Sequence, residues 1–227
     1  MLQRLNSTLN SLSRLVLCTK IQDQTPVSNK KFIIQAYVVC FVNNIENKFN
    51  GVNTKSLNSA FNSMKNKPEM AKVTFFVKSA WNGGFSVRSS SKDFRMCNQT
   101  IHRNMEYEMV YDFPEQLSGE GQGPTVCENC MGSLAACLTQ TIVAHAVSRG
   151  IKLDSINVNV EGDIDIRGFC GLSSDSRPGA QQFRVNMKIN SDTASKEQIN
   201  ELYEIGKKFS PAFDTLTNGT SVFVIGT

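Results

Sequence analysis

The stretch that decides the fold is Gly123–Gly150, GPTVCENCMGSLAACLTQTIVAHAVSRG, which carries helix signals at both of its ends. Thr125 with Glu128 three residues later is the capping-box pattern of a helix start. Gly150 after Arg149 is typical of a helix stop, because glycine tolerates the left-handed conformation and a cation suits the last turn. The sequence therefore predicts one long helix between these signals.

The predicted helix, residues 126–149, has a small and apolar middle. The residues that flank Cys137 there are Gly132, Ser133, Ala135 and Ala136. Small side chains let another backbone approach closely, so we predict a buried helix with a thiol at its most crowded point. A buried cysteine is commonly an inert small hydrophobe. These residues alone therefore leave open whether Cys137 is structural or a nucleophile.

The charges of the chain are divided unevenly along its length. The 227 residues carry a net charge of +4, with nine Lys or Arg and two acids before residue 69, and fifteen Lys or Arg and eighteen acids after it. The later part is mildly acidic, which argues against a nucleic-acid surface. Seven cysteines, an odd number, favour free thiols in a reducing compartment. The longest apolar run, residues 32–42, is too short for a membrane span.

The first 22 residues form an acid-poor leader with Leu at helical spacing among Arg, Ser, Thr and Asn. This pattern is typical of a mitochondrial-type transit peptide. We therefore predict residues 1–50 to be an N-terminal extension of transit peptide and linker, and a matrix-type organelle as the location. Two alternatives stay open, a cytoplasmic protein with a leader of no address and a leader that packs on the domain.

The rest of the chain, residues 51–227, predicts one domain. Apolar alternation predicts strands at 72–78, 85–88, 101–112, 156–160, 183–189 and 222–225, and helical spacing predicts further helices from Gly51 to Pro68 and from Ser195 to Pro211. The stretch 167–179 is predicted to be an ordered loop with Phe169 and Leu172 buried. This layout predicts an α+β fold with helices packed on antiparallel sheet.

An ordered series of short motifs resembles the OsmC/Ohr family of osmotically inducible and organic hydroperoxide resistance proteins. The motifs are Gly123-Pro124-Thr125, Leu134–Cys137, Arg149-Gly150-Ile151, Glu161–Phe169, Arg177-Pro178-Gly179 and Ser210–Leu216. The resemblance spans about residues 51–225. It implies an OsmC-like fold, with an antiparallel sheet wrapped around long central helices in an intertwined homodimer. It also implies sites near the dimer interface.

By the same resemblance, Cys137 occupies the position of the peroxidase nucleophile. A thiolate there attacks a hydroperoxide and becomes a sulfenic acid. Cys137 lies too far along its own helix for that helix's dipole to activate it, so it needs a charged neighbour.

The chain departs from the peroxidase pattern at three places. Ser210 stands where the resolving cysteine is expected, and Phe85 stands where the activating arginine is expected, with Arg88 the nearest substitute. Cys127 replaces the glutamate at the helix start, whereas Glu128 matches other branches of the family. These departures exclude the complete two-cysteine cycle of the family and leave open a single-cysteine mechanism that uses an external thiol, from a lipoyl protein or a glutathione-like molecule.

Other motifs have alternative interpretations. Cys127 and Cys130 form a C-x-x-C at a helix start, where a lowered thiol pKa and dithiol chemistry compete with two merely structural thiols. His102 and His145 are isolated, so we predict no metal site, and no sequence feature calls for a cofactor. We expect Arg167 and Arg177 to pair with Asp163, Asp165 or Asp175 and not to bind substrate.

We therefore predict thiol-dependent reduction of organic or lipid hydroperoxides in oxidative stress defence. The predicted catalytic residues are Cys137 as nucleophile, Arg88 as activator and Glu128 as a weaker candidate. The alternative is a catalytically inactive OsmC-fold protein that binds a small apolar ligand or a partner, and Ser210 and Phe85 favour it.

Overall fold

A computed structural model describes residues 48–226, which fall in the compact unit Asn47–Thr227. The predicted leader and most of the predicted extension therefore lie outside the described residues. Residues 48–50 are tied to the folded part, because the Asn50 side chain donates to Ile151 O at 2.8 Å and accepts from Leu153 N at 3.0 Å.

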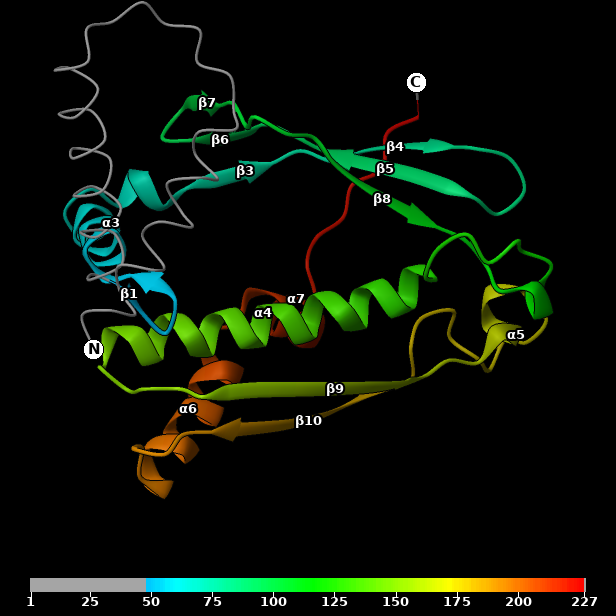
Figure 1. Cartoon of the computed structure of the whole chain (residues 1–227). Coiled ribbons are helices and arrows are strands. Elements are labelled where there is room, and N and C mark those ends of the chain that lie inside the picture. Colours follow the sequence, from blue (N-terminus) through cyan, green and yellow to red (C-terminus); the bar gives the residue numbers. More distant parts are fainter. Residues whose placement is uncertain (1–47, 227) are drawn as a thin grey trace, which may run out of the picture. The chain divides into compact units, whose positions relative to one another are not determined.

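The described chain has an α+β fold of four small antiparallel sheets and five α-helices (Figure 1). The strands are β1 Lys48–Phe49, β2 Val52–Asn53, β3 Val73–Phe75, β4 Lys78–Trp81, β5 Val87–Ser91, β6 Phe94–Met96, β7 Gln99–Ile101, β8 Tyr107–Tyr111, β9 Ser155–Asp163 and β10 Gln182–Asn190. The helices are α3 Thr54–Asn66, α4 Val126–Ser148, α5 Ile166–Phe169, α6 Lys196–Phe209 and α7 Pro211–Asn218, with short 3₁₀ turns η1 Pro68–Ala71 and η2 Glu115–Leu117.

Helix α4 begins and ends as the sequence predicts. Thr125 Oγ1 accepts from Glu128 N and the Glu128 carboxylate accepts from Thr125 N, which completes the capping box. At the other end Gly150 has a φ of 69°, a left-handed conformation that costs glycine no steric strain. The capping box of α6, formed by Ser195 and Gln198, is confirmed in the same way.

The strands depart from the prediction in several places; the strand predicted at 85–88 is β5 at Val87–Ser91, and β1, β2 and β6 were not predicted. The predicted strand 72–78 is two strands, β3 and β4, that belong to different sheets in the orders β3-β6-β7 and β4-β5-β8. The predicted strand 101–112 is divided in the same way between β7 and β8. The predicted last strand, 222–225, has no pairing partner among the described residues and is extended and exposed.

The core lies where α4 meets α6 and the β9–β10 hairpin (Figure 1). Its buried residues are Ile142, Ala146, Ile151, Leu153, Ile189, Leu202 and Ile205. Gly206 brings α6 close to α4, since a Cβ there would lie 3.2 Å from Ile142 Cδ1. The two helices therefore pack backbone to side chain at this crossing.

Only one face of α4 is buried in the protomer. Leu134, Leu138 and Ile142 are buried, whereas Gly132, Ser133 and Ala136 are exposed. The prediction of a wholly buried helix is therefore wrong for a single chain, because nothing in the described residues covers the small-residue face. By length and composition α4 is also the one described helix that could cross a membrane, a test that the core helix of a soluble protein passes as well.

Candidate active site and the adjoining cavity

The thiol of Cys137 lies at the start of α7. The side chain is partly buried, and Ala212 N donates to its Sγ at 3.4 Å. Ala212 is the second residue of α7, whose first N–H groups have no partner within that helix. Unpaired N–H groups and the positive end of a helix dipole favour an anion. The N-terminus of α7 therefore faces the thiol in place of the charged side chain that was expected there.

Ser210 makes this contact possible. Its side chain is buried, with 1% exposed, and its Oγ accepts from Phe213 N at 3.3 Å as the N-cap of α7. The residue at the expected resolving-cysteine position therefore holds the helix whose N–H faces Cys137. The sequence indicated only a stop at Pro211, although Ser followed by Pro is also a helix-start signal.

The other two predicted catalytic residues lie elsewhere in the protomer. Arg88 on β5 pairs across the sheet with Glu108, Nη1 to Oε2 at 2.9 Å, and both side chains are about half exposed. Glu128 is engaged in the capping box, and the N–H and hydroxyl of Thr125 lower its pKa. Within residues 48–226 no hydrogen bond or ion pair joins either side chain to Cys137.

The C-x-x-C thiols differ from the expectation of an activated dithiol. Burial, with Cys130 and Glu128 nearby, raises the pKa of the Cys127 thiol. Of the two alternatives left open by the sequence, this favours structural thiols over an activated dithiol, because desolvation and the neighbouring groups disfavour a thiolate at Cys127. Both cysteines are partly buried and unpaired, and both line a cavity.

That cavity lies along the start of α4, and Cys137 itself is not among its lining residues. It has a volume of about 730 Å³ and lies among the first three turns of α4, α7, β10, α5 and the loops around residues 113–117 and 177–182. Its walls are mainly apolar and include Phe113, Leu134, Ile166, Phe183, Phe213 and Leu216. Leu134 lies one turn before Cys137, so the cavity reaches the neighbourhood of the thiol.

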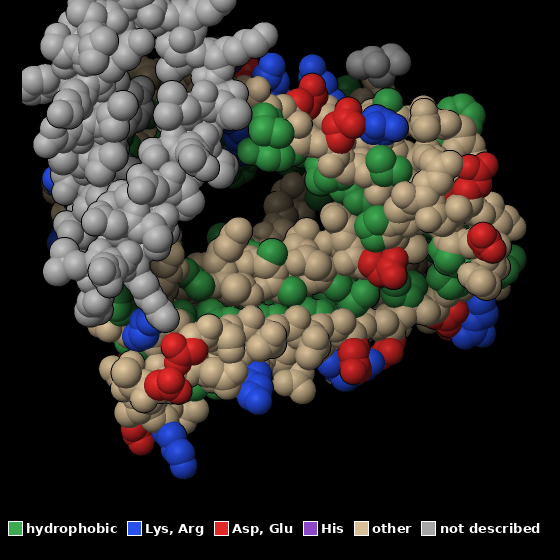
Figure 2. All heavy atoms as spheres, in the orientation of Figure 1, with side chains coloured by type: hydrophobic (Ala, Val, Ile, Leu, Met, Phe, Trp, Pro, Cys, Tyr) green, Lys and Arg blue, Asp and Glu red, His purple; other side chains and the backbone are tan. Residues whose placement is uncertain are grey.

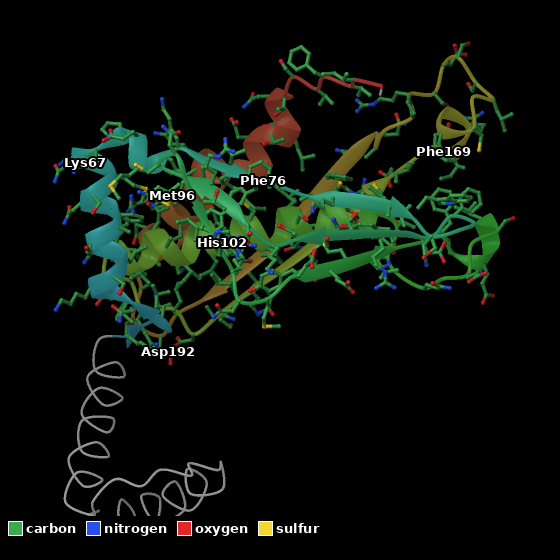
Figure 3. The ribbon with its side chains drawn as sticks, turned by 90° about the horizontal axis from the view of Figure 1, so that it is seen from above. Lys67, Phe76, Met96, His102, Phe169 and Asp192 are labelled. Carbon is green, nitrogen blue, oxygen red and sulfur yellow. The ribbon has the colours of Figure 1, made fainter. Side chains whose placement is uncertain are left out.

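Phe85 belongs to an aromatic stack at the edge of this cavity. Its ring stacks on Phe113 at 4.7 Å, and Phe113 meets Phe169 edge-on at 5.5 Å. Figure 3 shows Phe169 on α5 at the end of the domain where these rings gather. Where the activating arginine was expected, the chain therefore has an apolar contact that joins the β4–β5 turn to α5. Phe169 and Leu172 nevertheless stay 55% and 76% exposed, so their predicted burial is wrong for one chain.

The arginines of the 161–184 region divide into paired and unpaired. Arg167 binds Asp165 at 2.6 Å, as predicted. Asp163 and Glu161 are both held by Arg184. Within the described residues Arg177 pairs with no carboxylate, so the ion pair predicted for it is wrong. It lies instead on the wall of the cavity.

The histidines and acids do not gather into a metal site. His145 stacks on Phe209 at 4.9 Å, and burial together with Arg149 lowers its pKa. His102 pairs with Asp93 at 2.8 Å on the surface. Among residues 48–226 no group of three or more His, Cys, Asp or Glu is placed to hold a metal ion.

The family profile described as OsmC-like protein matches residues 119–224. This region holds α4 with Cys137, the β9–β10 hairpin, α6 and α7. Residues 119–224 therefore resemble OsmC-like proteins.

Solved structures of similar proteins include an OsmC-like protein from Mycoplasma pneumoniae, which is 19% identical. That alignment covers 63% of this chain and 86% of the other, with a TM-score of 0.49. An organic hydroperoxide resistance protein OsmC from Legionella pneumophila is 15% identical over 64% and 90% of the two chains, with a TM-score of 0.42. The organic hydroperoxide resistance protein OhrB of Bacillus subtilis is 19% identical over 64% and 93%, with a TM-score of 0.40. A search of curated proteins found no match.

Proposed function

We propose that this protein reduces organic or lipid hydroperoxides, with Cys137 as the nucleophile and an external thiol as the reductant. The observation that carries the proposal is the contact of the Cys137 sulfur with the N–H of Ala212 at the start of α7. A backbone N–H directed at sulfur holds a thiolate better than a neutral thiol. The wider role that we propose is defence against oxidative stress.

The proposed reaction has two stages. The Cys137 thiolate attacks one peroxide oxygen, the O–O bond breaks, and the protonated leaving oxygen departs as an alcohol while sulfur becomes a sulfenic acid. An external thiol then displaces water from that sulfur to form a mixed disulfide, and a second thiol restores Cys137. Ser210 cannot form a disulfide, which is why the second stage needs a reductant from outside.

Stopped-flow mixing with cumene hydroperoxide tests the nucleophile in the full chain. We expect Cys137→Ser to abolish rapid peroxide consumption, and Cys97→Ser, at an exposed cysteine, to leave it unchanged. Consumption by Cys137→Ser at the parent rate would disprove the reaction. Arg88→Ala and Glu128→Gln then test the two predicted helpers in the same assay.

We propose that the active protein is an intertwined homodimer. The exposed small-residue face of α4 and the exposed apolar side chains of β3, β4 and the C-terminal segment support it. Figure 2 shows hydrophobic side chains open to solvent in the region of β4, β5 and β8. Light scattering of the full chain tests the proposal, and a monomer would contradict it.

We propose import into a mitochondrial or related matrix, where lipoyl dithiols are at hand as reductants. The support is the acid-poor leader of residues 1–22, whose structure lies outside the described residues. Fusing residues 1–30 to a fluorescent reporter tests this address. A diffuse cytosolic signal would refute it.

A second candidate function is binding without catalysis. The cavity of about 730 Å³ favours it, because this volume lies in the usual range of small-molecule sites, roughly 300–1,000 Å³. It predicts that Cys137→Ser binds apolar ligands as tightly as the parent does.

A further inference from the structure

The cavity beside α4 contains a single charged residue. Of its lining residues only Arg177 carries a formal charge, and the others are apolar or neutral. A methyl group built on Gly179, also on the wall, would lie 3.4 Å from Arg177 Nη2. The guanidinium therefore folds back over a residue of the cavity wall and does not extend away from it.

Most of the charges near Arg177 in the sequence neutralise one another; the exception is Asp175, whose carboxylate accepts from Ser174 Oγ at 3.3 Å and pairs with no cation among the described residues. Asp165 binds Arg167 and also accepts from Ser176 Oγ at 2.5 Å. Arg184 holds Glu161 and Asp163, the two carboxylates of β9. Within the described residues no side chain satisfies the guanidinium of Arg177, which can offer five N–H donors.

The segment that carries Arg177 is fixed in place. Gln181 Nε2 donates to Arg177 O at 3.2 Å and to Gly179 O at 3.3 Å. Gly168 of α5 packs so closely that a Cβ there would lie 2.5 Å from Arg177 O. The arginine is thus presented by a held backbone, which lowers the cost of ordering it around a ligand.

We propose that this cavity binds a single-chain amphiphile with a carboxylate head, held by Arg177, and with its apolar chain among the aromatic and aliphatic walls. Guanidinium matches a carboxylate through two parallel hydrogen bonds. The apolar walls reward burial of an alkyl chain. Neither the carboxylate contact nor the chain contacts need the thiol of Cys137, so binding can be measured apart from the proposed peroxide reaction.

Calorimetry on the full chain carrying Cys137→Ser tests the head-group preference without thiol chemistry at that residue. The probes are dodecanoate below its micelle concentration and dodecanol. We expect dodecanoate to bind more tightly, and Arg177→Gln to weaken it by about tenfold or more. Dodecanol affinity stays within about twofold, because the alcohol makes no charge-assisted contact.

Three further variants distinguish binding at Arg177 from the general effect of removing a positive charge. Arg95→Gln removes the same charge from β6, which contributes nothing to the cavity wall, and leaves binding unchanged. Arg177→Lys keeps a cation and restores part of the affinity. Arg177→Glu reverses the preference toward dodecyltrimethylammonium. Equal losses from Arg177→Gln and Arg95→Gln, or equal affinity of the parent for dodecanoate and dodecanol, would overturn the proposal.

Cysteine alkylation locates the ligand. Cys127 and Cys130 lie on the cavity wall, whereas Cys97 is exposed on the turn between β6 and β7. We expect dodecanoate to slow the reaction of iodoacetamide at Cys127 and Cys130 and not at Cys97, measured by peptide mass spectrometry. Unchanged rates at both wall cysteines would place the amphiphile elsewhere and refute the site.

Discussion

The α4–α6 side of the domain and the β3–β8 side differ in how far one chain covers its own apolar residues. On the first side Leu138, Ile142 and Leu202 are at most 1% exposed. On the second side Phe75 and Trp81 are 64% and 76% exposed. The two sides have similar apolar composition, but only the α4–α6 side covers its apolar residues within one protomer. Exposed apolar surface such as that of the β3–β8 side is typical of an interaction site.

The largest effect is expected when a buried side chain on the α4–α6 side is shortened. Leu202→Ala removes a fully buried side chain from the core between α4 and α6. We expect a loss of about 2–5 kcal/mol in the free energy of unfolding, from lost transfer energy and the cavity left behind. Urea denaturation measures it. A loss below about 1 kcal/mol would show that this core is loosely packed.

A smaller, pH-dependent loss of folding stability is expected when Asp112 is replaced. This residue lies in the segment that joins the two sides. The residue is 2% exposed, and its carboxylate accepts from the N–H groups of Phe113, Glu120 and Gln122. Burial acts to raise the pKa of Asp112, but these three hydrogen bonds outweigh it and the pKa lies below its ordinary value.

Because the folded pKa of Asp112 is the lower one, its contribution is present above the unfolded value near 4 and disappears as pH falls through the folded value. We expect Asp112→Asn to lower the melting temperature at pH 7 and to approach the parent as the pH falls well below the ordinary pKa of an aspartate. Thermal melts across this range measure it. A constant difference at all pH values would show that the carboxylate charge is not what orders the loop.

Much of the packed side was predictable because its signals are local. The capping boxes of α4 and α6 and the alternation of β9 and β10 depend only on neighbours in sequence. The break between β3 and β4 was not predictable, because a continuous apolar run does not show where a chain changes sheets. The last strand was predicted from propensity, but a strand also needs a partner.

The candidate site was predictable in its residues and not in its geometry. Cys137 could be named from the resemblance, but its contact with Ala212 depends on α7, which folds back from 75 residues later in the chain. Of the acids expected to pair with Arg177, Asp165 is held by Arg167 and Asp163 by Arg184, and Asp175 bonds to its neighbouring serines instead. Which arginine pairs with which acid depends on their positions in the folded chain, and sequence spacing does not predict those positions.

A modest loss of folding stability is expected when the N-cap of α4 is removed. Thr125→Ala removes the hydroxyl that accepts from Glu128 N at 3.2 Å and leaves that N–H without its partner. We expect about 1 kcal/mol of destabilisation. Ser195→Ala at the matching position of α6 is the control, with a loss of similar size. A much larger loss for Thr125 would mean that this cap also supports the cavity wall, of which Thr125 is part.

The smallest change in the stability of the protomer is expected at the C-terminal segment, because its apolar side chains are the most exposed of all those compared. Phe223 is 88% exposed and lies in the apolar run 222–225 that has no strand partner among the described residues. Phe223→Ser should change the free energy of unfolding of a dilute, monomeric sample by less than about 0.5 kcal/mol. If a second copy covers this segment in the proposed homodimer, the same change raises the dissociation constant of the dimer. Sedimentation over a dilution series measures this constant, with Thr220→Ser as a control beside the apolar run. Identical dissociation of Phe223→Ser and the parent would exclude the segment from the interface and leave the exposed strands β3 and β4 as the surface to test.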